Sequence, residues 1–288
     1  MTIQRGTLNM REIALVVHPQ RLVARELADI VQRWWQDRGV VVHTDDGEDG
    51  PSEALFQRDI DCVISLGGDG TMLRTVALAA PSGIPVLGVN LGNLGYLTTV
   101  EPDEVTQACA LLAAGDYAVE DRMLLEVSIT SGDSGQEIVS KVVAMNEVVV
   151  EKTSDGHTIH LAVKIGNDQF LTYAADGMLV STPTGSTAYN LSLRGPIVSP
   201  RLEALVMTPI APHMLFDRTL IIEPELRICF ELLADREAVA VVDGERIAEL
   251  SPGDLVEVGA SPHVARMIKI GDRGFYKILH TKFGLLDR

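Results

Sequence analysis

Short, wholly apolar runs alternate with amphipathic segments over roughly the first 118 residues. Such runs are typical of strands buried on both faces of a parallel sheet, and they predict strands at residues 13–18, 40–42, 61–64 and 85–89. Residues 21–37 repeat apolar positions with the period of a helix, and residues 104–114 form a second predicted helix. Alternating strands and helices predict an α/β domain with a doubly wound parallel sheet, which binds ligands beyond the carboxyl ends of its strands.

The pattern changes after residue 120, where strand-like segments are joined by Ser, Gly and Asp turns. These segments cover residues 124–130, 142–150, 159–165, 169–174, 220–222, 227–232, 238–242 and 255–258. The only good helical candidate nearby is 184–193. A chain of 288 residues exceeds a typical single domain. We therefore predict an α/β domain over 11–120, a mostly antiparallel, β-rich domain over 121–273, and a segment, 274–288, that returns to the first domain.

The charge balance limits the partners of this chain. Its 24 basic and 40 acidic residues give a net charge of −16, which argues against a nucleic acid or an anionic membrane as the main partner. A polyanionic substrate must then meet local Arg or Lys side chains, backbone amides or a metal ion. No charged-then-apolar leader opens the chain, and no run approaches the roughly 18 apolar residues of a membrane-spanning helix. We expect a soluble, cytoplasmic protein.

Its three cysteines are far apart and form no C-x-x-C pair, so we expect free thiols rather than disulfides or a zinc site. His157 and His160 form H-x-x-H, but a strand would point them to opposite faces, which argues against a metal pair. The chain contains neither a Walker A motif, nor a G-x-S-x-G elbow, nor a G-x-G-x-x-G fingerprint. P-loop chemistry is therefore not expected.

A glycine turn, Ser65 to Thr71, follows the predicted strand 61–64 and precedes a helix-forming segment, 72–80. A strand, a glycine turn and a helix aim backbone N–H groups and the positive end of the helix dipole at an anion. The glycines allow positive φ angles and close approach of a ligand. A phosphate cradle gains nothing from a carboxylate, so Asp69 indicates a catalytic or hydroxyl-orienting role. A tight turn without a ligand remains the alternative.

Asn146 and Glu147 interrupt an apolar strand. Burying an amide and a carboxylate without partners costs on the order of several kcal/mol, so something must form hydrogen bonds with them. The hydroxyl groups of a ligand would do so. The alternative is a turn or edge position at which neighbouring backbone satisfies both side chains.

Residues 176–189 are the densest polar cluster of the chain. Proline, threonine and glycine end a strand and open a helix, with several hydroxyls at its start, which suits a phosphate or a polar heterocycle that stacks on Tyr189. Helix capping explains one or two of these hydroxyls, but not all of them. Asp243-Gly244 is first of all a hairpin signal.

Together these motifs resemble the NAD kinases, from about residue 11 to the C-terminus. The resemblance is carried by Gly67-Gly68-Asp69-Gly70-Thr71, by Asn146-Glu147, and by Asp176-Gly177 leading into Ser181-Thr182-Pro183-Thr184-Gly185-Ser186-Thr187-Ala188-Tyr189. Further matches are Asn90-Leu91-Gly92, Gly95-Tyr96-Leu97-Thr98, Gly195-Pro196-Ile197 and Asp243-Gly244. The glycine turn alone is shared with diacylglycerol kinases, sphingosine kinases and phosphofructokinases. One departure is Glu245-Arg246, where the family often has glutamine after Asp-Gly.

The resemblance implies transfer of the γ-phosphoryl group of ATP to the 2′-hydroxyl of the adenosine ribose of NAD, giving NADP, with Mg²⁺ as cofactor. Some bacterial relatives also use inorganic polyphosphate. Asp69 would orient the hydroxyl and take its proton, at a site between the two domains. The donor phosphates would be held by Mg²⁺, without an assigned metal-ligating side chain, and by Gly67, Gly68, Gly70, Thr71 and Arg74. The relatives imply a homodimer or homotetramer.

The same resemblance assigns the NAD-binding residues. Besides Asp69 and Gly70, they are Asn146 and Glu147 at ribose hydroxyls, Thr187, Ala188 and Tyr189 around the nucleotide, and Ala174 and Asp176 near the nicotinamide. Ala174 and Asp176 are two residues apart on a predicted strand, so they should share a face. In the NAD kinases, the residue that matches Ala174 is arginine in some enzymes and small in others. With its small Ala174, this chain resembles the enzymes that prefer NAD to NADH. The negative charge of Asp176 would favour the positively charged oxidised ring.

Two other functions are considered. A lipid kinase of the diacylglycerol type needs an apolar acceptor pocket, and the hydroxyl-rich residues 181–189 argue against it. A non-catalytic dinucleotide sensor on the same fold would not need Asp69. Assays with NAD and with a lipid diol would separate these functions.

Overall fold

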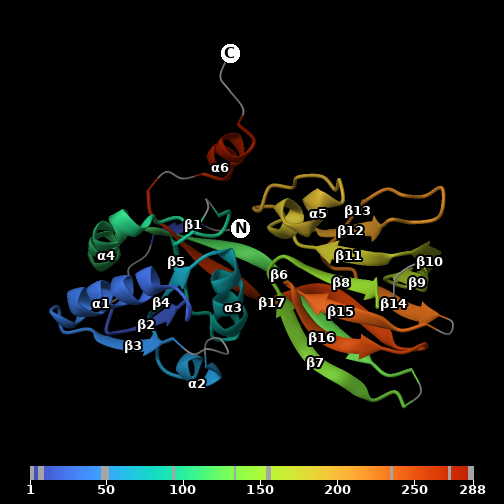
Figure 1. Cartoon of the computed structure of the whole chain (residues 1–288), viewed down its shortest axis with the longest axis horizontal. Helices are drawn as coiled ribbons and strands as arrows, with labels where there is room; N and C mark the ends of the chain where they lie inside the picture. Colours follow the sequence, from blue (N-terminus) through green and yellow to red (C-terminus); the bar gives the residue numbers. More distant parts are fainter. Residues whose placement is uncertain are drawn as a thin grey trace. The chain divides into compact units, whose positions relative to one another are not determined.

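The computed structural model describes residues 3–5, 10–46, 52–92, 95–132, 134–153, 157–233, 236–271 and 274–284. The chain forms two compact units, which we call unit 1 (Met1–Arg122 with His263–Arg288) and unit 2 (Met123–Pro262). Two strands, β6 (Ala118–Thr130) and β17 (Leu255–Lys269), run from one unit into the other (Figure 1). The chain returns to unit 1 at His263, earlier than the predicted boundary at 274, because the last part of β17 pairs with a strand of unit 1.

Unit 1 is the predicted α/β domain. Its strands are β1 (Ile3–Arg5), β2 (Glu12–Val17), β3 (Val41–Asp45), β4 (Cys62–Gly67) and β5 (Val86–Asn90). Its helices are α1 (Leu22–Gln36), α2 (Glu53–Phe56), α3 (Asp69–Ala79), α4 (Val105–Ala114) and α6 (Phe275–Lys282), with 3₁₀ turns at Ala80–Ser82 and Pro102–Glu104. The sheet order is β3-β2-β4-β5-β17 with parallel pairing, which confirms the predicted fold class.

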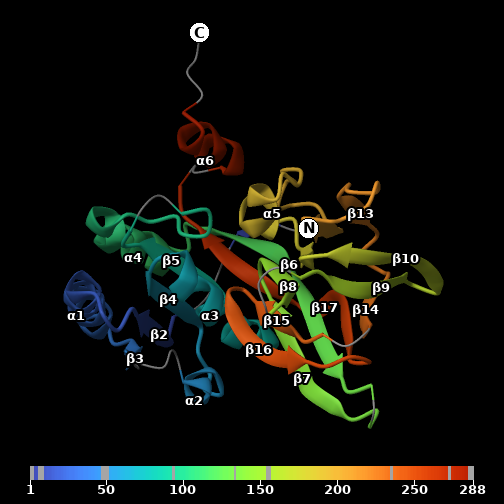
Figure 2. The ribbon, with the colours of Figure 1, turned by 45° about the vertical axis from the view of Figure 1, so that its right-hand side comes forward.

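Helices cover both faces of this parallel sheet. Helices α1 and α4 pack against each other on one face, and α3 lies with α2 on the other (Figures 1 and 2). The β2 side chains Ile13, Leu15 and Val17 share a core with α1 and α4, in which Trp35 is fully buried. Both faces are therefore apolar, which is why the strands read as unbroken apolar runs.

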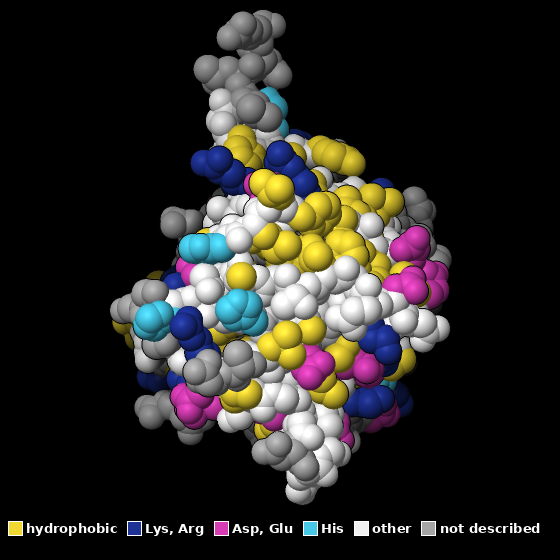
Figure 3. All heavy atoms as spheres, turned by 90° about the vertical axis from the view of Figure 1, so that its right-hand side faces the viewer, with side chains coloured by type: hydrophobic (Ala, Val, Ile, Leu, Met, Phe, Trp, Pro, Cys, Tyr) yellow, Lys and Arg dark blue, Asp and Glu magenta, His cyan; other side chains and the backbone are white. Residues whose placement is uncertain are grey.

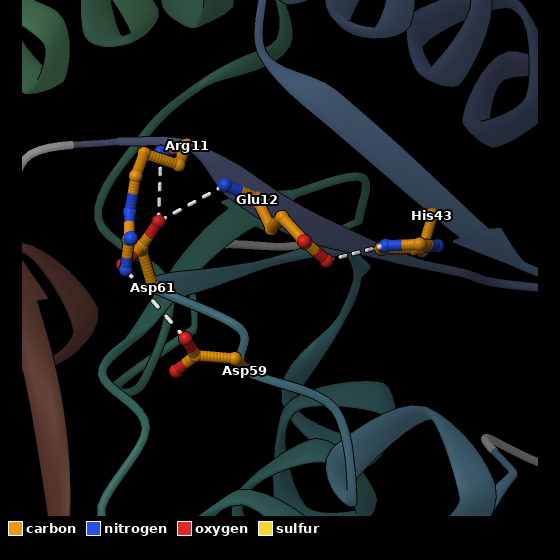
Figure 4. A network of polar contacts seen from close by, with 5 residues as sticks. All are labelled: Arg11, Glu12, His43, Asp59 and Asp61. Atoms are coloured by element: carbon orange, nitrogen blue, oxygen red, sulfur yellow. Dashed lines mark hydrogen bonds and ion pairs between the residues drawn. The ribbon is translucent and has the colours of Figure 1, made fainter.

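A polar network joins the amino ends of β2 and β4, together with β3 (Figure 4). The Asp61 carboxylate accepts hydrogen bonds from the amides of Arg11 (2.7 Å) and Glu12 (2.9 Å). Glu12 pairs with the ring of His43 at 3.0 Å, and Arg11 lies 3.5 Å from Asp59. These contacts tie the amino ends of the strands together at one edge of the sheet.

Unit 2 consists of antiparallel sheets. One has the order β13-β12-β11-β8-β15-β16, a second contains β10-β9-β14-β17, and β6 pairs with β7. The bounds are β7 (Glu137–Ala144), β8 (Glu147–Lys152), β9 (Ile159–Ile165), β10 (Asp168–Ala175), β11 (Gly177–Ser181), β12 (Leu205–Ile210), β13 (Leu220–Ile222), β14 (Ile228–Leu233), β15 (Ala238–Val242) and β16 (Glu245–Leu250). Side chains of both sheets, such as Met178 and Phe230, share one core. The prediction of a mostly antiparallel second domain is confirmed.

Two predicted elements of unit 2 are interrupted. The strand predicted over 142–150 is the end of β7 and the start of β8, with a break at Met145 and Asn146. The helix predicted over 184–193 is a 3₁₀ turn, Gly185–Thr187, followed by a single turn, α5 (Tyr189–Ser192). Ala188 separates them, because its φ of −96° and ψ of −126° are not helical. Within the described ranges, no helix is long and apolar enough to cross a membrane.

Candidate active site

The glycine turn lies at the carboxyl end of β4 and continues directly into α3. The helix starts at Asp69, earlier than predicted, so Asp69, Gly70 and Thr71 form its first turn. The amides of a first helical turn have no acceptor within the helix. These N–H groups are therefore available to donate hydrogen bonds at the end of the sheet, as in known anion sites.

The glycines of this turn are needed for space, and the positive φ angles that we predicted for them are wrong. None of Gly67, Gly68 and Gly70 has a positive φ. A Cβ at Gly67 would collide with the side chain of Thr71, which is buried. A Cβ at Gly68 or Gly70 would meet nothing within 4 Å among the described residues. The backbone at these two positions thus faces open space, where a ligand can approach the amides.

The Asp69 carboxylate is held by the second glycine turn. Its Oδ2 accepts a hydrogen bond from the amide of Tyr96 (3.1 Å), and its Oδ1 accepts one from the amide of Leu97 (3.3 Å). A Cβ on Gly95 would collide with Oδ1, so only glycine allows this approach. The carboxylate is therefore fixed beside the donor amides of α3.

Two basic side chains that the sequence analysis missed lie near this turn. His18 follows β2 directly, and burial together with the charges of Arg21 and Arg74 lowers its pKa. The Arg21 guanidinium donates a hydrogen bond to the carbonyl of Leu91. Sheet order could have identified these two residues. Strand β2 is the parallel neighbour of β4, so residues that follow β2 lie beside the glycine turn. Three basic side chains thus gather at one edge of a strongly acidic protein.

In unit 2, the carboxylate of Asp243 organises the break between β7 and β8, at Met145 and Asn146. Asp243 lies in the two-residue turn between β15 and β16, with a φ of 48°. It accepts hydrogen bonds from the amides of Met145 (2.8 Å), Asn146 (2.8 Å) and Glu147 (3.0 Å). The Asp243-Gly244 hairpin is therefore also the part that holds the strand break open.

Glu147 is a buried carboxyl group with one unsatisfied oxygen. It is 8% exposed, and its Oε2 has no hydrogen-bond partner among the described residues. Burial and the nearby Asp243 raise its pKa to about 8, against a lowering by the backbone amide of Tyr189. A buried oxygen without a partner is costly, so this atom is the strongest sign of a ligand in unit 2.

Most hydroxyls of residues 181–189 serve the local structure. Ser181 donates to the carbonyl of Thr182 (2.6 Å), Thr182 to that of Met145 (2.6 Å), and Ser186 to that of Pro183 (2.7 Å). For these three residues, hydrogen bonds within the turn account for the hydroxyls. Their bonds lock this segment to the 145–147 break, because Thr182 reaches across to it.

Other predicted residues remain accessible. Tyr189 is 38% exposed, and Thr187 and Ala188 precede it at the helical turn. Burial raises the pKa of the Tyr189 hydroxyl, and three nearby carboxylates raise it further. They belong to Glu151, Glu147 and Asp176. Unit 2 therefore brings the predicted residues around Tyr189 together.

Asp176 is placed differently from the prediction. It lies at the bend between β10 and β11, outside the strand that contains Ala174, so the argument that both share a strand face does not apply. Its Oδ1 is 2.7 Å from the Nζ atom of Lys152. The ion pair offsets the negative charge that was expected to select the oxidised ring. Sequence reasoning missed Lys152 because it lies on another strand, β8.

Comparisons with known proteins agree with these features. The family models described as ATP-NAD kinase N-terminal and C-terminal domains match residues 48–117 and 145–270. The chain is 41% identical to an NAD kinase of Heliobacterium modesticaldum over 275 residues, covering 92% of this chain and 94% of the relative. It is 32% identical to that of Wolinella succinogenes over 293 residues, covering 100% of both.

Solved structures show the same fold. The yeast NADH kinase in complex with NADH superposes with a TM-score of 0.86 at 23% identity, covering 97% of this chain and 89% of that one. The NAD kinase from Archaeoglobus fulgidus in complex with ATP gives a TM-score of 0.74 at 24% identity, covering 96% and 98%.

Proposed function

The chain belongs to the NAD kinase family, and we propose that Asp69 orients the acceptor hydroxyl in its reaction and takes the proton of that hydroxyl. The reaction transfers the γ-phosphoryl group of ATP to the 2′-hydroxyl of the adenosine ribose of NAD and gives NADP. The 2′-oxygen forms the new bond to phosphorus, the bond to the β,γ-bridging oxygen breaks, and ADP leaves. The observation that carries the proposal is the fixed carboxylate of Asp69 beside the first-turn amides of α3.

The donor phosphates bind, in this proposal, to the amides of the turn Gly67, Gly68, Gly70 and Thr71. The open space at Gly68 and Gly70 supports this placement, since the phosphates can approach the backbone there. Phosphoryl transfer needs alignment and neutralisation of charge more than covalent chemistry by the protein. Arg74 and Arg21 supply positive potential at this edge, beside His18, whose lowered pKa favours the neutral ring.

We propose Mg²⁺ as part of the substrate, bound to ATP. Among the described residues, no three His, Cys, Asp or Glu side chains gather into a potential metal cage. Mg²⁺ is commonly held through substrate phosphates and one or two carboxylates, with several waters, so a protein cage is not required. Polyphosphate as an alternative donor would use the same amides.

The NAD molecule binds, in this proposal, to Asn146 and Glu147 through ribose hydroxyls. The unsatisfied Oε2 atom of Glu147 supports this role, because a hydroxyl would supply the missing donor. Thr187, Ala188 and Tyr189 line the nucleotide, with the Tyr189 ring partly exposed for stacking. Asp176 and Ala174 lie toward the nicotinamide, and the small side chain of Ala174 favours NAD over NADH.

A homodimer or homotetramer is the proposed assembly. Figure 3 shows hydrophobic side chains gathered on one face, and exposed hydrophobic residues of unit 2 include Phe170 on β10, Leu215 and Ile221. Phe170 packs edge-on against Phe216, with 5.8 Å between ring centroids. Light scattering after size exclusion should show an oligomer that Leu215→Asp with Ile221→Asp reduces. Leu22→Asp, at an exposed apolar position of unit 1, should leave it intact.

A coupled assay tests the function directly. The purified protein with NAD, ATP and Mg²⁺ should form NADP, and it should not phosphorylate a diacylglycerol. NAD binding by calorimetry without NADP formation would instead identify a dinucleotide sensor. Phosphorylation of the lipid in preference to NAD would contradict the proposal.

A further inference from the structure

The orientation of Asp69 depends on a turn outside its own helix. The amides of Tyr96 and Leu97 bind the two carboxylate oxygens, at 3.1 Å and 3.3 Å. The buried hydroxyl of Thr98 has no partner among the described residues and lies 2.8 Å from the Cβ position of Gly95, which also touches Asp69. A shift of this turn would therefore change where the carboxylate points.

The two residues whose amides bind Asp69 are held in different ways. The Leu97 side chain is buried, so its amide is anchored by the core of unit 1. Tyr96 is only half-buried, and its ring contacts the C-terminal helix. The position of the Tyr96 amide therefore depends on what holds its ring.

Helix α6 holds that ring with the first and last residues of the helix. The Phe275 ring packs against Tyr96 at 6.4 Å between centroids, and the Nζ atom of Lys282 lies 4.1 Å from the Tyr96 ring centroid. Residues seven apart lie on one face of a helix, so both contacts come from the same side of α6. A lysine over an aromatic ring is an attractive cation–π contact.

We propose that α6 is a clamp that positions Asp69 for phosphoryl transfer by fixing Tyr96. The proposal rests on the catalytic role proposed for Asp69. Phe275 and Lys282 are positioning residues, since they act through the Tyr96 ring and its backbone amide. Burial raises the pKa of the Tyr96 hydroxyl, and the nearby charge of Asp69 raises it further.

The clamp predicts a loss of turnover with little loss of substrate binding. Phe275→Ala and Lys282→Met should each lower kcat by roughly tenfold, because small misplacements of a catalytic group cost large factors in rate. KM for NAD and for ATP should change by less than about twofold, since neither residue binds substrate. Lys277→Met, on the same helix and exposed, is the matched control and should leave kcat unchanged.

Conservative variants distinguish clamping from general damage. Tyr96→Phe and Lys282→Arg keep the ring and the cation, so both should retain most of the turnover. Tyr96→Ala should lower kcat about as much as Phe275→Ala does. The double variant Tyr96→Ala with Phe275→Ala should have a kcat little lower than either single variant, as expected for two residues of one contact. Lys282 is exposed, so its substitution tests the clamp even where Phe275→Ala lowers stability.

A double-mutant cycle with Asp69→Asn tests whether the clamp acts through the carboxylate. Without the carboxylate there is nothing to position, so Phe275→Ala should cause no further loss of kcat in that background. An equal loss in both backgrounds, or wild-type kcat for Phe275→Ala and Lys282→Met, overturns the clamp and leaves the role of Asp69 intact. Wild-type turnover of Asp69→Asn alone overturns the proposed role of Asp69 instead.

Discussion

The two units build their candidate sites in opposite ways. In unit 1, backbone amides and a carboxylate gather where parallel strands end, and the surrounding side chains are basic. In unit 2, a buried carboxylate, Asp243, holds a strand break open beside a second buried carboxyl group, Glu147. The first arrangement suits phosphates and proton transfer, and the second suits neutral hydroxyl groups. Substitutions should therefore affect rate in unit 1 and affinity in unit 2.

The largest effect is expected at Asp69. Asp69→Asn keeps the size of the side chain but removes the proton acceptor, so kcat should fall by roughly 10²-fold or more. Calorimetry should show NAD affinity nearly unchanged. Turnover within a factor of about three of wild type would contradict the assignment.

The second effect is expected at Asp243, and it should be one of affinity. The substitution Asp243→Asn leaves a single carbonyl oxygen for three amides, and a buried amide without an acceptor costs about 1–3 kcal/mol. The 145–147 break should then shift, and NAD binding should weaken by roughly tenfold while ATP binding is retained.

A matched carboxylate separates affinity from stability in that experiment. Asp254 caps another turn of unit 2, where it accepts bonds from the amides of Gly132 (3.1 Å) and Ser251 (2.8 Å). Asp254→Asn should lower the free energy of unfolding by a similar amount without changing the NAD dissociation constant. Equal loss of NAD affinity in both variants would show that unit 2 responds to stability alone.

Glu147 should make the stability of the free protein depend on pH. Its folded-state pKa of about 8 lies above the ordinary value of 4.5, so folding favours the protonated form. This contribution is fully present below pH 4.5 and is lost as the pH rises through about 8. In denaturant titrations, the free energy of unfolding of the wild type should fall as the pH rises from about 5.5 to 8.5. Over the same range, the fall for Glu147→Gln should be smaller by roughly 2–3 kcal/mol.

The same variant tests ligand binding. Glu147→Gln should weaken NAD binding more than ATP binding, because its proposed partners are ribose hydroxyls. Unchanged NAD affinity in calorimetry would mean that the Asn146-Glu147 break is structural.

The smallest effect is expected at the Lys152–Asp176 ion pair. Lys152→Met leaves the charge of Asp176 without its partner, which should raise the preference in kcat/KM for NAD over NADH by about two- to fivefold. Lys164→Met, on β9, is the control and should not change the ratio. Ala174→Arg should lower the preference in kcat/KM for NAD over NADH. Equal kcat/KM values for NAD and NADH in the wild type would contradict the preference itself.

Local pattern was enough to predict the fold class and the position of the glycine turn. The apolar runs of β2, β4 and β5 are unbroken because helices cover both faces of the sheet, and such runs are visible in sequence. The polar residues Asn146 and Glu147 were visible as an interruption of an apolar run, but a strand was predicted over 142–150 and the break between β7 and β8 was not. What holds the break open was not visible.

Local pattern was wrong where a residue type serves more than one purpose. Gly67 is required because Thr71 packs where a Cβ would lie, not because of a positive φ. The hydroxyls of Ser181 and Ser186 donate to neighbouring carbonyls, which accounts for two of the hydroxyls that the cluster seemed to offer to a ligand. A hydroxyl or a glycine looks the same in the sequence whichever role it serves. Only its neighbours in space distinguish one role from another.

The sequence by itself determined the two kinds of sheet, the phosphate-type turn with its single carboxylate, and the family resemblance. Only the tertiary structure decided what holds the chemical groups in place: Asp243 binds amides nearly a hundred residues earlier in the chain, and Phe275 reaches Tyr96 from the C-terminal helix. Periodicity and turn chemistry act over a few residues, so they specify elements. Contacts between elements depend on how the chain returns to itself, and no local pattern encodes them.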